Sequence, residues 1–523
     1  MTTRRPGLKA ALLAATAVCI PMLAPAARAA ASRPPNVIVI LADDLGYGDT
    51  GVYGSSLVRT PNIDRLAASG VRFTAAYVTH PVCAPSRAGL LTGRYQERFG
   101  YEFNPAGKDA TGGVSLKEIT VAQVMKSAGY ATGMIGKWHL GQSGPYYPTA
   151  RGFDHFFGMA GGGSTYLIDP KPGDEIVQPG RSDVVVEPGG ALSGSSGTAQ
   201  DLKTRLEKAR SRGAISRDGA VVRADGYLTD DFTRAAVDYI EANKGRPFFL
   251  YLAYNAPHVP LQATQKYLDR YRDVKDPGKR VYAAMVSALD DGVGAVEAEL
   301  RRAGLAEDTL VLFLSDNGCP DYDLGACSNA PLRGFKRTHF EGGVRVPFIV
   351  SWPGHVPAGR LDGRQVSSLD ILPTAAAVAR AKLPADREYD GVDLIPYLTG
   401  RSRGVPNPVL FWRAGGTFAI RDGAWKMLLL NKAPPGAKPS MRWLPPAVAQ
   451  APPYDARYGR LALLYDLNDD VGERRNLAGA KPGVVTRLEA MLAKWSRKLV
   501  PAQWVSVKQF YQRYDDVVAH LYD

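Results

Sequence analysis

Short apolar runs recur along the first three quarters of the chain, and polar residues follow most of them. The run at 36–42 is apolar and rich in β-branched residues, and it leads directly into Asp43 and Asp44. A run of this length without polar alternation is typical of a strand that is buried on both faces and lies in a parallel sheet. Similar runs occur at 131–135, 247–254, 309–314 and 347–351.

Helical patterns separate these runs, at 63–69, 120–128, 230–243 and 279–303. Alternating strands and helices predict an α/β fold, in which a large, mostly parallel or mixed sheet is sandwiched by helices. Ligands in such sheets bind beyond the carboxyl ends of the strands. We therefore expect one site, assembled from the polar residues that follow the runs. These are Asp43 and Asp44, Lys137 and His139, Asn255 and His258, and Asp316 and Asn317.

The composition changes twice along the chain, and both changes suggest domain organisation. The main domain is predicted to span 32–400, with a loop-rich insertion at 161–226 that is rich in Gly, Ser, Pro and charge. Such an insertion either shapes substrate choice or is a disordered surface segment. Short strand patterns and one amphipathic helix pattern predict a smaller C-terminal α+β domain with an antiparallel sheet at 405–523. Those patterns lie at 408–412, 417–420, 425–430 and 484–499.

Residues 1–29 have the pattern of a signal peptide. A basic start precedes an apolar run at 10–23, and Ala27-Arg28-Ala29 forms a cleavage site. The pair Arg4-Arg5 resembles a twin-arginine export signal, although ordinary secretory signals also carry paired basic residues. No later segment is long and apolar enough to span a membrane. We expect an exported protein, periplasmic or secreted, that has no membrane partner.

The formal net charge is +13, and cleavage after Ala29 removes four basic residues and leaves +9. A basic protein attracts anionic substrates through its overall field. The basic residues are dispersed and no nucleic-acid motif is present, so we expect no nucleic-acid partner. Other anionic polymers or small anionic molecules fit this charge as well.

The most informative stretch is Cys83-Ala84-Pro85-Ser86-Arg87, which Thr92-Gly93-Arg94 follows. Pro85 suits the first turn of a helix, because its missing N–H would have no partner there. The helix N-terminus attracts anions, and Arg87, four residues after Cys83, returns to the same face with a positive charge. The stretch predicts an anion-handling site with a nucleophile precursor. A buried structural cysteine at an ordinary helix start is the alternative.

Four oxygen-bearing side chains at two strand ends indicate a cation site. They are Asp43, Asp44, Asp316 and Asn317. Hard oxygen ligands without His or Cys favour Ca²⁺ or Mg²⁺ over zinc. Any one of these side chains could instead cap a helix or brace a loop, but two pairs at two strand ends favour a metal.

The cysteine stretch resembles the signature of the type I, formylglycine-dependent sulfatases of the alkaline-phosphatase-like superfamily: Cys-x-Pro-Ser-Arg, then Thr-Gly-Arg. The segment 129–141, which contains Lys137 and His139, resembles the second signature of that family. His258 after Ala256-Pro257, and Lys336 six residues before Gly342-Gly343, also match the family. The resemblance runs from about 36 to about 397, and the insertion at 161–226 has no clear counterpart.

The resemblance implies hydrolysis of a sulfate ester, of a sulfated carbohydrate or an aryl sulfate, with release of inorganic sulfate. A maturation enzyme would oxidise Cys83 to formylglycine (3-oxoalanine), whose hydrated aldehyde attacks sulfur. One Ca²⁺, with Mg²⁺ the less favoured ion, would be held by Asp43, Asp44, residue 83, Asp316 and Asn317. The implied catalytic residues are Cys83, Arg87, Lys137, His139, His258 and Lys336.

The family also implies a role for each of these groups. Asp316 would take the proton of the attacking hydroxyl, while Arg87, Lys137 and Lys336 neutralise the sulfuryl oxygens. His258, together with Lys336, would protonate the leaving alcohol, and His139 would deprotonate the second hydroxyl to expel sulfate.

Two alternative functions and one cysteine pairing stay open. A phosphonate monoester or phosphodiester hydrolase could use the same scaffold, and a non-catalytic protein could bind sulfated glycans. With Cys83 converted, Cys319 and Cys327 remain in the mature chain, eight positions apart. An oxidising compartment predicts a disulfide between them, with two free thiols as the alternative.

Overall fold

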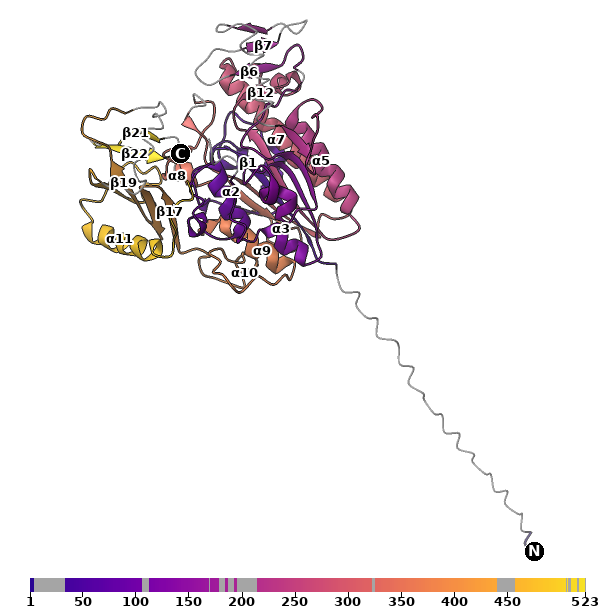
Figure 1. Ribbon diagram of the computed structural model, residues 1–523. Coiled ribbons are helices and arrows are strands. Elements are labelled where there is room, and N and C mark those ends of the chain that lie inside the picture. The colour runs from indigo at the N-terminus through magenta and orange to yellow at the C-terminus, as the bar shows by residue number, and fades with distance from the viewer. Residues whose placement is uncertain are drawn as a thin grey trace. The chain divides into compact units, whose positions relative to one another are not determined.

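The structure is a computed structural model. It describes residues 1–3, 33–105, 112–168, 170–177, 184–186, 192–194, 214–321, 325–439, 457–504, 506, 509–514 and 517–522. Apart from its first three residues, the predicted signal peptide at 1–29 lies outside the described residues. Residues 34–523 form one compact unit. Its largest element is a mixed sheet with helices on both faces (Figure 1).

Parallel strands form the middle of this sheet. In sheet order they are β5 (His155–Met159), β4 (Ala131–Lys137), β11 (Phe248–Pro257), β1 (Asn36–Asp43) and β13 (Thr309–Ser315). Each run predicted to be a strand in this region is one. Their carboxyl ends therefore meet at one edge of the sheet, as expected for parallel neighbours.

Antiparallel pairing begins on both sides of this parallel group. Beyond β13 lie β14 (Phe348–Ser351), β2 (Val71–Phe73) and β15 (Arg360–Asp362). The run at 347–351 is thus a strand, but β14 pairs antiparallel with β13. Its carboxyl end lies at the opposite edge of the sheet and contributes nothing to a site at the edge where β1 and β13 end.

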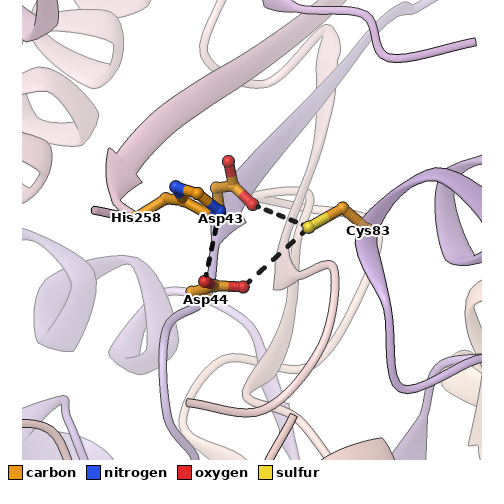
Figure 2. Close-up of side chains that lie close together, drawn as sticks. All are labelled: Asp43, Asp44, Cys83 and His258. Atoms are coloured by element: carbon orange, nitrogen blue, oxygen red, sulfur yellow. Dashed lines mark hydrogen bonds and ion pairs between the residues drawn. The ribbon is translucent and has the colours of Figure 1, made fainter. Parts of the chain in front are cut away.

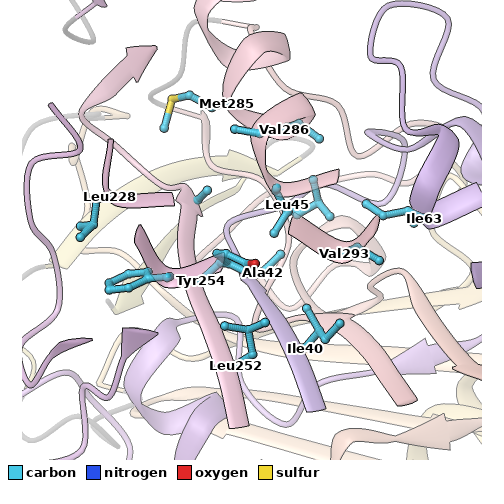
Figure 3. Close-up of a cluster of buried hydrophobic side chains, with 14 of the residues drawn as sticks. Ile40, Ala42, Leu45, Ile63, Leu228, Leu252, Tyr254, Met285, Val286 and Val293 are labelled. Carbon is cyan, nitrogen blue, oxygen red and sulfur yellow. The ribbon is translucent and has the colours of Figure 1, made fainter. Parts of the chain in front are cut away.

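Alternate side chains of β1 point to opposite faces of the sheet, as the period of a strand requires. Ile38, Ile40 and Ala42 join a buried cluster with helices α1 (Pro61–Ala68), α5 (Leu228–Asn243) and α7 (Pro277–Arg302). Figure 3 shows part of this cluster. Val37, Val39 and Leu41 join the cluster on the other face, with α2 (Cys83–Thr92), α3 (Val121–Ser127) and α9 (Ile371–Val378). The predicted α/β class with helices on both faces is confirmed.

The insertion at 161–226 contains short strands in its described parts. β6 (Glu175–Val177), β7 (Val184–Val186) and β8 (Leu192–Gly194) form a second sheet with β12 (Leu261–Ala263). Two further strands, β9 (Ile215–Arg217) and β10 (Ala220–Val221), extend the main sheet beyond β5. Strands of two or three residues are too short to show a periodic pattern, which is why the sequence predicted only loops here.

The C-terminal part carries the predicted antiparallel sheet. Its strands are β17 (Val409–Ala414), β18 (Thr417–Asp422), β19 (Trp425–Lys432), β20 (Arg460–Asp466), β21 (Gln509–Tyr514) and β22 (Val517–Tyr522). Helix α11 (Pro482–Ser496) packs on one face of this sheet, and the other face packs on the segments around Tyr77 and Phe340. A domain boundary at 400–405 stays a prediction. Among the described residues, no helix combines the length and apolar character needed to cross a membrane.

A fully buried ion cluster joins the C-terminal sheet to the segment that begins at Glu341. The Lys426 Nζ of β19 lies 2.7 Å from Glu341 Oε1 and 3.5 Å from Glu473 Oε1. The backbone N–H of Glu341 donates to Glu473 Oε2 (2.7 Å). Glu341 begins the short helix α8 (Glu341–Val344), five residues after Lys336. The cluster therefore braces the segment that carries Lys336 from the side of the C-terminal sheet.

Replacement of Lys426 by Met should destabilise the fold strongly. It removes the cation that contacts Glu473 and one of the cations that contact Glu341, which keeps Arg345 at 3.0 Å, and breaking a buried pair by removing one partner costs about 3–5 kcal/mol. The matched control is Lys126→Met, because Lys126 pairs with Asp154 at 2.6 Å while the two side chains are 52% and 42% exposed. Loss of that exposed pair should cost below about 1 kcal/mol. The free energies of unfolding can be compared in urea; equal losses would contradict a dominant role for the buried cluster.

Candidate functional site

Two pairs of acidic and amide side chains meet where β1 and β13 end side by side. Ala42 is opposite Ser315 in the parallel register, and the Asp316 N–H continues the ladder by donating to the Ala42 carbonyl (3.0 Å). The Asp44 N–H donates to Asp316 Oδ1 (3.2 Å). Asp43, Asp44, Asp316 and Asn317 are all fully buried. The strand register alone thus brings together residues that are more than 270 positions apart.

Helix α2 places Cys83 directly against this group. The residue before it, Val82, is extended, and the helix begins at Cys83 with Pro85 in its first turn. Cys83 is 2% exposed. Its Sγ lies 3.4 Å from Asp43 Oδ1, 4.0 Å from Asp44 Oδ1 and 3.2 Å from Lys336 Nζ. Figure 2 shows the sulfur pointing between the two aspartates, with His258 on their other side.

Two lysines from different segments neutralise the paired aspartates of β1. Lys137, the last residue of β4, donates from Nζ to Asp43 Oδ2 (2.6 Å). Lys336 Nζ donates to both carboxylate oxygens of Asp44 (2.7 and 2.9 Å). Both lysines are buried, so each is held in place by its carboxylate.

The guanidinium group of Arg87 contacts carboxylate oxygens and not the sulfur of Cys83. Its Nε donates to Asp316 Oδ2 (2.9 Å) and its Nη1 donates to the Lys137 carbonyl (2.9 Å). Its Nη2 lies 2.7 Å from Asp316 Oδ2 and 3.5 Å from Asp43 Oδ1. The helical spacing predicts a cation on the same face as Cys83, and Arg87 Nη2 and Cys83 Sγ both lie within 3.5 Å of Asp43 Oδ1 at the strand ends.

The two histidines follow neighbouring strands, β4 and β11, which lie on the same side of β1. His258 follows β11; its Nε2 lies 3.6 Å from Asp44 Oδ2, and its Nδ1 lies 2.7 Å from the Val259 carbonyl. Because a carbonyl only accepts, Nδ1 carries the proton and Nε2 faces the site. His139 follows β4, two residues after Lys137, and lies within the electrostatic influence of Lys137, Arg87 and Lys336.

Burial and neighbouring charges shift the protonation of these groups. Burial, together with the negative charge of Asp43, raises the pKa of Asp316 to about 6. Burial would also raise the pKa of Asp44, but the charges of Lys336, His258 and Lys137 outweigh it and hold that pKa below its usual range. Burial raises the pKa of the Cys83 thiol well above its usual value. A sulfur at position 83 is therefore a neutral thiol near pH 7.

Both histidines favour their neutral form. Burial, followed by the charges of Lys336 and Lys137, lowers the pKa of His258 to about 3, against the opposing charge of Asp44. Burial and the charges of Lys137, Arg87 and Lys336 lower the pKa of His139 well below its usual range. An arriving anion would oppose these positive fields and raise both pKa values.

The donor set fits a hard divalent cation. Ligand atoms of Asp43, Asp44, Cys83 and His258 all lie within 4.8 Å of one another. Asn317 donates from Nδ2 to Asp44 Oδ1 (2.6 Å), while its Oδ1 is buried without a hydrogen-bond donor among the described residues. Asp316 lies beside this group, where its Oδ1 accepts the backbone N–H of Asp44, and carboxylate and amide oxygens are the ligands that Ca²⁺ and Mg²⁺ prefer. A second group, Asp49 with Cys319 and Cys327, offers no thiolate, because the two cysteines form a disulfide.

The Cys319–Cys327 disulfide confirms the predicted pairing. It closes the loop that follows Asn317, and the Cys319 carbonyl accepts the backbone N–H of Lys336 (3.0 Å). Asn329 fastens the loop: its Oδ1 accepts from the Cys319 N–H, and its Nδ2 donates to the carbonyls of Cys319 and Gly334. Sequence reasoning missed Asn329, because a single Asn in a loop carries no signal of such a role.

Known proteins with related sequences and structures have sulfatase descriptions. The family model Sulfatase matches residues 35–381. Arylsulfatase A of Homo sapiens is 36% identical over 494 residues, covering 90% of this chain and 89% of that protein. The crystal structure of Ps i-CgsB in complex with k-i-k-neocarrahexaose has a TM-score of 0.74 and 32% identity, covering 90% of this chain and 95% of that one. The PsFucS1 sulfatase from Pseudoalteromonas sp. has a TM-score of 0.67 and 26% identity, covering 91% and 92%.

Proposed function

The chain belongs to the sulfatase family and is a sulfuric ester hydrolase, and we propose that it cleaves the sulfate ester of a sulfated carbohydrate or an aryl sulfate through a formylglycine made from Cys83. One observation carries the proposal: Cys83 Sγ lies within 3.5 Å of both Asp43 Oδ1 and Lys336 Nζ. Position 83 thus faces a cation-binding carboxylate group and an ammonium group at once.

The environment of Cys83 favours a converted residue over a thiolate. The thiolate is the nucleophilic form of cysteine, and burial raises the pKa of this thiol far above neutral pH. The charges of Lys137 and Lys336 lower this pKa, but burial outweighs them, and the charges of Asp316 and Asp43 raise it further. Conversion to formylglycine supplies a hydrated aldehyde, whose hydroxyl groups attack sulfur and later release sulfate.

Asp43, Asp44, Asp316, Asn317 and residue 83 would hold one divalent cation, with calcium favoured over magnesium. Three carboxylates face three buried cations, Arg87, Lys137 and Lys336, so the formal charges of the side chains cancel. A bound Ca²⁺ would supply Lewis acidity to this site. The charges of the chain's own residues therefore cancel before the ion binds. A bound divalent cation would give the site a net positive charge, which attracts an anion.

The lysines and Arg87 have distinct tasks in this scheme. Lys336, which contacts both Asp44 and Cys83, and Lys137 lie where they can neutralise sulfuryl oxygens as charge develops. Arg87 holds Asp316 and Asp43 in place, and the carboxylate of Asp316 accepts the proton of the attacking hydroxyl. His258, whose Nε2 faces the site, donates a proton to the leaving alcohol once the anionic substrate has raised its pKa. His139 acts as the base in the second half of the reaction.

The substrate class follows from relatives, and the location follows from the N-terminus. The aryl alternative rests on the similar arylsulfatase A, and the carbohydrate alternative rests on Ps i-CgsB, which was solved with k-i-k-neocarrahexaose. Residues 1–29 would direct export to the periplasm or the medium, where the Cys319–Cys327 disulfide persists. The implied partners are the sulfated substrate and a maturation enzyme that makes formylglycine.

Cys83→Ala should abolish turnover, because it removes the precursor of the nucleophile. Mass spectrometry of the tryptic peptide that contains residue 83 should show, in active wild-type protein, the mass loss of thiol-to-aldehyde conversion. Circular dichroism and thermal unfolding of the variant serve as the folding control. Fully active protein with an intact thiol at this position would contradict the proposed nucleophile.

Calcium affinity should depend on pH through Asp316. In the cation-free site this carboxyl takes up a proton as the pH falls through about 6, and a bound cation requires its ionised form. Affinity should therefore be constant well above that pH and weaken below it, by up to about tenfold per pH unit. Calorimetric titration of chelator-treated protein measures this, and Asp316→Asn should remove the dependence together with most of the binding. A dissociation constant that is the same at acid and neutral pH would contradict the assignment.

Sulfate esters should be turned over faster than phosphorus esters. Rates on an aryl sulfate and on sulfated mono- and oligosaccharides can be compared with rates on an aryl phosphate diester and a phosphonate monoester. Faster cleavage of the phosphorus esters would assign the site to that chemistry instead. Binding of sulfated glycans without release of sulfate from any ester would show a non-catalytic binding protein.

A further inference from the structure

Packing, rather than hydrogen bonding, sets the orientation of the His139 ring. Its Nδ1 is buried and has no hydrogen-bond partner among the described residues. The backbone at this position is left-handed, with φ of 62°, and is fixed from the side of β5. The Trp138 N–H donates to the Met159 carbonyl (3.0 Å), and the His139 N–H donates to the Ala160 carbonyl (3.2 Å). The chain that leaves β5 therefore runs beside His139.

That chain segment contains Gly162, whose missing side chain leaves room for the His139 ring. A Cβ atom on Gly162 would lie 2.4 Å from Nε2, 2.7 Å from Cε1 and 3.0 Å from Cδ2 of His139. These three ring atoms are its nearest neighbours, and all lie at or inside the closest approach that real Cβ atoms show. A Cβ atom on the next residue, Gly163, would have no heavy atom of the described residues within 4 Å apart from those of its chain neighbours. Neither glycine has a positive φ, so alanine introduces no backbone strain at either.

We propose that Gly162 is a positioning residue for His139: it is glycine because any side chain there would displace the imidazole. The proposal rests on the proposed function, in which His139 is the base that completes turnover. No described residue forms a hydrogen bond with Nδ1 that would hold the ring against displacement. An alanine at 162 would move the flexible ring instead of the backbone, and small misplacements of a catalytic group cost large factors in rate.

A double-mutant cycle separates this role from a general structural one. Gly162→Ala should lower kcat by about tenfold to a hundredfold, with a smaller change in KM. Gly163→Ala, the matched control, should stay within about twofold of wild type. In a His139→Ala background the clash is gone, so adding Gly162→Ala should change the remaining rate by less than about twofold. A wild-type rate for Gly162→Ala, or the same loss with and without the His139 ring, would overturn the proposal.

A readout independent of turnover keeps the inference distinct from the proposed function. Crystal structures of Gly162→Ala and Gly163→Ala should show a displaced His139 ring in the first and an unchanged ring in the second. An unmoved ring in Gly162→Ala would overturn the positioning role, whatever the substrate of the enzyme. A displaced ring in a protein that releases sulfate from no ester would support the positioning role and refute the proposed function alone.

Discussion

The site depends on one constraint: charges removed from water must be paired with opposite charges. Three carboxylates with no solvent exposure lie at the ends of β1 and β13, and three cationic side chains contact them. A buried ion that lacks its partner is strongly destabilising. The two sets must therefore reach the same point during folding, although α2, β4 and the segment around Lys336 are far apart in the sequence. The arrangement of the proposed catalytic groups and the stability of the sheet edge are consequences of the same pairing.

The rest of the molecule holds those pairs in register. Parallel pairing of β1 with β13 places the aspartates, and parallel pairing of β4 with β11 places Lys137. No strand places Lys336, and this residue relies on two braces. One is the disulfide loop, through the Cys319 carbonyl, and the other is the buried cluster of Glu341, Glu473 and Lys426. The C-terminal sheet, which supplies Lys426, thereby supports a residue of the site without lining it.

The sequence predicts those features of the fold and of the site that local patterns of residues encode. The run at 36–42 is apolar on both faces because both faces of β1 are buried, so the strand, its class of sheet and the polar residues at its end are all visible in the sequence. The partner of Arg87 is not visible in the sequence. Helical spacing fixes only the face of α2 on which Arg87 lies, whereas the register of β13 decides which carboxylate lies opposite that face. Gly162 carries no sequence signal either, since its close approach to His139 arises only when β4 and β5 lie side by side.

The burial of Cys83 also imposes an order in time. A residue that is 2% exposed, at the start of a helix whose residues are all buried, is out of reach of a modifying enzyme once α2 has docked. The proposed conversion of Cys83 to formylglycine would therefore compete with folding in each molecule. Under this proposal, a chain that folds first would trap its thiol and stay inactive until it unfolds. The specific activity of a preparation would then reflect the ratio of the two rates, and a slower-folding chain would give a larger active fraction.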